Sequence, residues 1–145
     1  MMYKVLDVAQ YIVDYSNEKG YFVNSYKLQN ILYFVQASFL CEKDAPCFNE
    51  GMEAVDWGVY IKQVLYRYRR YGLSSVFVME DMRRASCIGK EDKKIIEEIV
   101  DECHGYSNNA LIEIIRNQRP WKDARRSVSG KISIEGMREY FNETC

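Results

Sequence analysis

The segment KLQNILYF occupies residues 27–34, and its apolar side chains recur at the three- and four-residue spacing of an α-helix. Asn24 or Ser25 can cap the start of this helix, because a side-chain oxygen there accepts a hydrogen bond from an otherwise unpaired backbone N–H. The pattern continues to about Cys41. The side chains expected on its inward face are Leu28, Ile31, Leu32, Val35 and Phe39.

Two polar positions of the same segment lie on another face of the predicted helix. Gln29 and Tyr33 are four residues apart, so their side chains are neighbours on the helix surface. We expect them to offer polar contacts to a neighbour rather than to join the apolar stripe.

Helical spacing recurs along most of the chain. The other segments that show it are residues 4–19, 61–71, 91–103, the stretch between Ser107 and Pro120, and 133–141. Ser107 and Ser133 are suitable N-caps, and Gly20 is suited to ending the first helix.

Between the helices, residues 52–57 suit a short extended piece that ends at Gly58, and residues 75–79 suit either a strand fragment or a loop. Pro120 is expected to end the helix before it, since the residue preceding a proline avoids helical geometry, and residues 125–130 have the composition of a polar loop. No repeat or change of composition divides the chain. The sequence therefore predicts a single domain over residues 1–145, mainly α-helical, with about six helices and a possible small β insertion.

The composition narrows the classes of protein to be considered. Of 145 residues, 48% are hydrophobic and 28% charged, and the net charge is −1, which excludes a generally basic nucleic-acid coat. No run approaches the 18 apolar residues of a membrane-spanning helix, and the start lacks the apolar run of a signal peptide. The five cysteines contain no CxxC pair and are expected to be free thiols. We therefore expect a cytoplasmic protein.

Sequence signals for catalysis or cofactor binding are absent. No phosphate-binding glycine loop, GxSxG or HExxH motif occurs, and one histidine without paired cysteines gives no metal-ligand pattern. Cys103 and His104 are adjacent, but neighbours on a helix point about 100° apart, so a packed thiol and a histidine at a helix end are expected. The sequence predicts a protein that is not an enzyme and holds no cofactor or metal.

The charge is strongly polarised along the chain. Seven basic and two acidic residues give residues 61–90 a net charge of +5, whereas two basic and seven acidic residues give residues 91–113 a net charge of −5. Within the first block, arginine alternates with tyrosine over residues 66–71. This composition is found on ordinary solvated faces, in protein interfaces and on surfaces that bind nucleic acid. The acidic helix could also cover the basic helix inside the fold.

Three stretches resemble the signatures of one family. KLQNILYF resembles the KLQKLLYF helix of the Panacea-domain (SocA-like) family, and residues 54–72 are similar to its AW-x-aromatic-GPV segment and the following helix that ends in YG. The stretch from Ser107 to Trp121 is similar to its S…L…H-x-x-x-PW element. The residues that carry these matches are Lys27, Leu28, Gln29, Tyr33, Trp57, Gly58, Pro120 and Trp121.

The chain departs from these signatures at three positions. Val55 replaces the signature tryptophan, Val59 replaces the proline of the Gly-Pro-Val turn, and Arg116 replaces the usual histidine. Trp121 is expected to cover the small core, and Trp57 to anchor a tight turn that Gly58 permits. The signatures therefore favour a role in specifying the fold, with partner choice made elsewhere.

The resemblance implies an α-helical antitoxin or adapter of a bacterial or prophage toxin–antitoxin module, which binds a protein toxin or delivers it to a protease and is not an enzyme. The alternatives are a phage-encoded inhibitor of a host defence complex, and a nucleic-acid-binding regulator that uses residues 66–71 or Arg125 and Arg126. The residues expected to contact the partner are Tyr60, Tyr66, Arg67, Arg69, Arg70 and Arg116.

Overall fold

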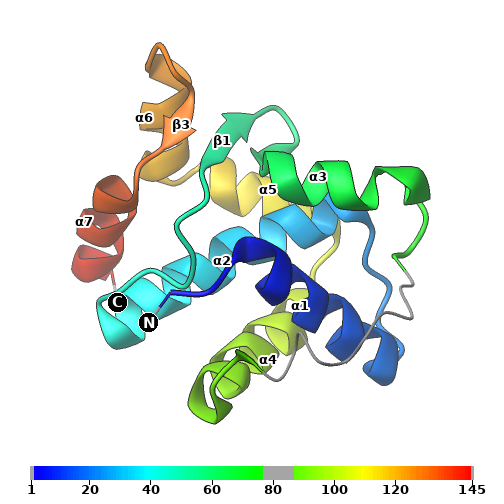
Figure 1. Cartoon of the computed structure of the whole chain (residues 1–145). Helices are drawn as coiled ribbons and strands as arrows, with labels where there is room; N and C mark the ends of the chain where they lie inside the picture. The colour runs from blue at the N-terminus through cyan, green and yellow to red at the C-terminus, as the bar shows by residue number, and fades with distance from the viewer. Residues whose placement is uncertain (1, 77–86, 145) are drawn as a thin grey trace.

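The computed structural model describes residues 2–76 and 87–144 (Figure 1). Its helices are α1 (Val5–Lys19), α2 (Ser25–Lys43), α3 (Lys62–Tyr68), α4 (Lys90–His104), α5 (Asn108–Arg116), α6 (Arg119–Arg126) and α7 (Ile134–Thr144). Its strands are β1 (Met52–Val55), β2 (Gly58–Tyr60) and β3 (Lys131–Ile132), and a 3₁₀ turn, η1 (Arg69–Tyr71), follows α3. The predicted fold class, mainly α with a small β insertion, is confirmed.

Helix α2 lies at the centre of the fold and packs against α1, α3, α4, α5, α7 and β2. The predicted inward residues Leu28, Ile31, Leu32, Val35 and Phe39 are all buried. Polar side chains on the other faces of α2 are buried as well, so this helix has no solvated side along most of its length. An α-helix buried all round is typical of the centre of a helical domain.

The buried amides of α2 pair with backbone groups of the segments around it. Gln36 Oε1 accepts hydrogen bonds from the N–H groups of Cys47 and Phe48 at 2.8 and 3.3 Å, and its Nε2 donates to the Phe48 carbonyl at 2.8 Å. Asn30 Oδ1 accepts from the Val59 N–H at 3.0 Å. These contacts satisfy backbone groups in the loop after α2 and in the strand β2, which would otherwise be buried without partners.

The predicted helix ends are confirmed where a cap residue was identified. Asn24 accepts from the Lys27 N–H at 2.8 Å, Ser107 accepts from the Ala110 N–H at 3.1 Å, and Ser133 accepts from the Gly136 N–H at 2.9 Å. Gly20 ends α1 with a φ of +76°, a conformation that suits glycine.

The small β insertion is a three-stranded antiparallel sheet in the order β2-β1-β3. The extended run expected over residues 52–57 is β1 and the turn after it, and the second strand of the hairpin was not expected. Gly58 starts β2 with a φ of +104°, and a Cβ at this position would lie 2.3 Å from Asn30 Oδ1. The hairpin can therefore approach α2 this closely only because residue 58 is glycine.

Helix α6 corrects the prediction for the C-terminal third of the chain. Helix α5 ends at Arg116, before Pro120 is reached, and Pro120 lies in the first turn of the next helix, α6. A proline is favoured there because its missing N–H has no partner within the helix. The start of the predicted polar loop, Arg125 and Arg126, belongs to α6. Most of the run expected over residues 75–79 lies outside the described residues.

The acidic helix α4 does not cover the basic helix α3. Figure 1 shows the two helices on opposite sides of α1 and α2, against which both of them pack. Tyrosines contact the acids of α4 instead: Tyr11 donates to Glu97, and Tyr15 donates to Asp101 at 2.9 Å. Burial, together with these hydrogen bonds, raises the pKa of both tyrosines, so they remain neutral donors.

Asp92 ties the start of α4 to two other elements. Lys43, at the end of α2, forms an ion pair with it, and the Tyr3 hydroxyl donates to its other oxygen. Burial opposes ionisation of Asp92, but the hydrogen bonds from Lys43 and Tyr3 outweigh it and lower the pKa of this carboxyl below its ordinary value.

The thiols differ from the prediction at one residue. Cys47, Cys87 and Cys103 are free, as expected. Cys41 is disulfide-bonded, so the prediction is wrong there. The packing of α7 on α2 brings Cys41 Sγ within 3.9 Å of the Phe141 carbonyl oxygen, a proximity that cysteine spacing cannot reveal. Cys145 lies outside the described residues.

We predict that Gly58→Ala lowers the free energy of unfolding by roughly 2–4 kcal/mol, because it adds both backbone strain and a clash with Asn30. Urea unfolding followed by circular dichroism measures the loss. Gly51→Ala is the matched control, since a Cβ there meets nothing within 4 Å. Equal stability of the two variants would contradict this account of the hairpin.

We predict that Asp92→Asn destabilises the fold at neutral pH and has little effect at low pH. The lowered pKa of Asp92 means that its contribution is present above the unfolded-state pKa of about 4 and is lost as the pH falls through the folded-state value. Urea midpoints of wild type and variant should therefore differ at pH 7 and converge near pH 2. A gap of constant size across this range would refute the assignment.

Candidate functional site

Three signature side chains of α2 make hydrogen bonds to other segments of the same chain. Gln29 Oε1 accepts from the Ile61 N–H at 2.8 Å, and the Tyr33 hydroxyl donates to Gln118 Oε1 at 2.7 Å. Lys27 Nζ donates to the Tyr106 carbonyl at 2.8 Å. The neighbours that Gln29 and Tyr33 contact are thus elements of the same chain, and these residues position the start of α3 and the α5–α6 turn.

Trp121 is the second internal anchor. Its side chain is buried, and its indole Nε1 donates to the Gly58 carbonyl at 2.8 Å, with a longer contact of 3.3 Å to the Val55 carbonyl. Trp121 therefore attaches α6 to the hairpin, and its burial agrees with its expected role as a cover for the core.

Trp57 differs from the other signature residues because it is exposed. It lies in the turn between β1 and β2, with 43% of its surface accessible, and its ring meets the Tyr26 ring edge-on at 6.4 Å. Gly58 permits the tight turn, as predicted, but the tryptophan beside it faces outward. An exposed tryptophan in a hairpin turn is well suited to contact another protein.

Three of the predicted contact residues come together in one depression, which we call the α3 pocket. Tyr60, Tyr66 and Arg69 line a cavity of about 350 Å³ together with Tyr26, Lys62 and Leu65. The Arg69 guanidinium lies over the Tyr66 ring at 4.2 Å. Tyr66 is two-thirds exposed, so this pair presents an aromatic and cationic surface to solvent.

Arg67 and Arg70 lie outside the lining of the α3 pocket, although the sequence grouped them with Tyr66 and Arg69. The Arg70 guanidinium lies over the Tyr71 ring, and that of Arg67 lies over the Tyr68 ring. Tyr68 is itself buried and donates to Gln10 at 3.3 Å. Neighbouring residues of a helix point in different directions, so Arg67 and Arg70 are separated from Tyr66 and Arg69 although they are close in the sequence.

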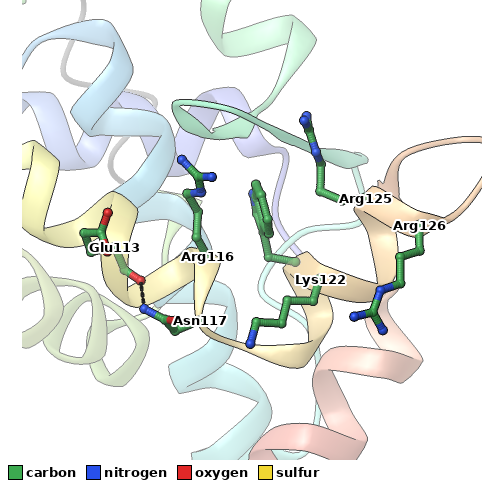
Figure 2. A pocket seen from close by; sticks show the side chains of 7 residues that line it. Glu113, Arg116, Asn117, Lys122, Arg125 and Arg126 are labelled. Atoms are coloured by element: carbon green, nitrogen blue, oxygen red, sulfur yellow. Dashed lines mark hydrogen bonds between the residues drawn. The ribbon is translucent and has the colours of Figure 1, made fainter.

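Arg116 lies in a different depression, which we call the α5–α6 pocket. Figure 2 shows Glu113 and Arg116 on α5 and Lys122, Arg125 and Arg126 on α6, with the Lys122 side chain extending toward Asn117. The cavity measures about 470 Å³, and its lining also includes Asn117 and Trp121. Four of its side chains are cationic and one is acidic.

Two of these cations are held in place by neighbours. The guanidinium groups of Arg116 and Arg125 lie 5.1 and 5.3 Å from the Trp121 ring centre, and Arg125 also forms a 2.8 Å ion pair with Asp56 in the hairpin turn. Lys122 and Arg126 are exposed and one helical turn apart. Lys122 is not among the predicted contact residues, although its spacing from Arg125 and Arg126 places it near them on a helix such as α6.

The adjacent Cys103 and His104 do not form a catalytic pair. Burial raises the pKa of the Cys103 thiol to about 12, so the thiol stays protonated at neutral pH. The His104 ring stacks on Tyr21 at 3.9 Å between ring centres. In the described part of the chain no group of three or more acids, cysteines or histidines could hold a metal ion, and no helix is long and apolar enough to span a membrane.

A comparison with known families identifies the same family that the signature motifs resemble. The family model described as "Antitoxin SocA-like, Panacea domain" matches residues 28–122, well over half of the chain. The chain belongs to this antitoxin family. No curated protein and no solved structure matches it.

The matched region ends inside the α5–α6 pocket. Of the signature residues, only Lys27 lies outside it. The lining of the α3 pocket lies within it except for Ser25 and Tyr26. Arg116 and Lys122 of the α5–α6 pocket also lie within it. Arg125 and Arg126 lie beyond it. The pocket thus combines positions inside and outside the family match.

We predict that Trp121→Phe lowers the free energy of unfolding by about 1–3 kcal/mol, because the Gly58 carbonyl loses its indole donor in a buried setting. Thermal and urea unfolding measure the effect. Trp57→Phe is the matched control, since it changes the exposed tryptophan of the same hairpin region. A control that loses as much stability as Trp121→Phe would contradict the anchoring role.

Proposed function

We propose that this protein is a non-enzymatic antitoxin that neutralises a protein toxin by binding it directly. The observation that carries the proposal is the match to the SocA-like antitoxin family over residues 28–122. In this proposal the protein acts as a single domain and binds the toxin in the cytoplasm.

The surface that supports this proposal best is the α3 pocket with the exposed Trp57 beside it. Tyrosine, tryptophan and arginine are enriched among the residues that dominate binding energy at protein interfaces. Tyr66, Arg69 and Trp57 are exposed, whereas most signature residues are buried within the fold. The exposed residues are therefore the ones that can recognise a partner.

The test is co-expression with the product of the gene next to its own. We expect the wild-type protein to restore growth to cells that express the toxic neighbour and to co-purify with it. Constant levels of the neighbour, measured by immunoblot, indicate neutralisation by complex formation, whereas falling levels indicate delivery to a protease. A toxic neighbour that is neither bound nor relieved would refute the proposal.

We predict that Tyr66→Ala/Arg69→Ala raises the dissociation constant of the complex at least ten-fold, about 1.4 kcal/mol. These side chains contact each other on the surface, so their removal should leave the thermal unfolding of the free protein unchanged within about 1 kcal/mol. Phe22→Ala/Lys94→Ala is the matched control, because it removes an exposed aromatic ring and an exposed cation elsewhere. Equal affinities of the two double variants would exclude the α3 pocket from the interface.

A further inference from the structure

The α5–α6 pocket concentrates positive charge that the fold does not neutralise. Its cations are Arg116, Lys122, Arg125 and Arg126, and its one acid is Glu113. Arg125 is paired with Asp56, but across residues 2–76 and 87–144 the other three cations form no ion pair. Like charges one helical turn apart, such as Lys122 and Arg126, repel each other. A bound anionic group would relieve this repulsion.

The pocket is also partly preorganised for an anion. Arg116 and Arg125 are restrained against Trp121, which is itself buried and bonded to the hairpin. A guanidinium that is already ordered loses less conformational entropy when it pairs with a carboxylate. The Arg125–Asp56 pair at 2.8 Å shows that a carboxylate can reach this edge of the pocket.

The two pockets border the same hairpin. Asp56 and the Gly58 carbonyl hold Arg125 and Trp121 at the α5–α6 pocket, whereas Tyr60, two residues further along, lines the α3 pocket. Trp57 is exposed in the turn between β1 and β2. A single partner that covers the hairpin can therefore contact both pockets.

We propose that the α5–α6 pocket binds an acidic segment of the protein partner, with aspartate or glutamate side chains placed against Arg116, Lys122 and Arg126. This inference rests on the proposed function, because it names the part of the partner that this surface contacts. Charge complementarity is the argument for the occupant: three unpaired cations surround an open, compact depression of about 470 Å³.

The surroundings of the pocket favour an acidic protein segment over a nucleic acid. Nucleic acids are bound through cationic surfaces that follow many successive phosphates. Here the net charge of the chain is −1, and the adjacent helix α7 carries Glu135, Glu139 and Glu143. A compact group of cations next to an acidic helix therefore fits a short acidic segment better than a long polyanion.

The experiment compares two charge reversals of identical spacing. Lys122→Glu/Arg126→Glu changes exposed cations four residues apart in the pocket, and Lys90→Glu/Lys94→Glu changes exposed cations four residues apart on α4. Both variants alter the net charge by the same amount. Thermal unfolding shows that each is folded, and calorimetric titration with the purified product of the neighbouring gene measures the dissociation constant between 50 and about 300 mM salt.

We expect the pocket variant to raise the dissociation constant at least ten-fold and to flatten its salt dependence, and the α4 variant to change it less than about two-fold. Equal effects of the two reversals would overturn the inference while leaving the proposed function standing. If the pocket variant lost binding to random duplex DNA and kept its affinity for the protein partner, the inference would be overturned in favour of a nucleic acid. Absence of any complex with the wild-type protein would refute the proposed function, and this inference with it.

Discussion

Three buried amide side chains on α2 determine where the rest of the chain can pack. Gln36 pairs with the backbone of the loop after α2, Asn30 pairs with the start of β2, and Gln29 pairs with the Ile61 N–H that precedes α3. A buried backbone group without a partner costs about 1–3 kcal/mol, so each of these segments depends on the amide that it meets. Glycine at position 58 is required for the Asn30 contact, because a Cβ there would prevent the hairpin from approaching Asn30.

Several residues of the family signature are engaged in contacts within the chain. Hydrogen bonds within the chain engage the side chains of Gln29, Tyr33 and Trp121. These bonds position α3, the α5–α6 turn and the hairpin relative to one another. The exposed residues carried by those elements, such as Tyr66 and Arg69, are not part of these internal contacts. In the proposed function, the exposed residues on the two sides of this hairpin are the ones that contact the partner.

Most of the helical framework could be predicted because its signals are local. Asn24, Ser107 and Ser133 cap the helices that they were expected to cap, since a capping bond spans only two or three residues. Helix α6 could not be predicted from Pro120, because a proline is equally suited to follow a helix end and to lie in a first turn. The contacts of Tyr11 and Tyr15 with α4 were missed because each joins residues 86 positions apart.

The sequence by itself determined the fold class, most helix boundaries and the family, because periodicity, capping and signature motifs are all contained in short stretches of chain. It could not determine which contact residues share a surface. Only the tertiary structure placed Tyr60, Tyr66 and Arg69 in one pocket and Arg116 with Lys122 and Arg126 in another. The physical reason is that this division depends on how α3 and α6 dock around the hairpin, through hydrogen bonds such as the Trp121–Gly58 contact between residues 63 positions apart.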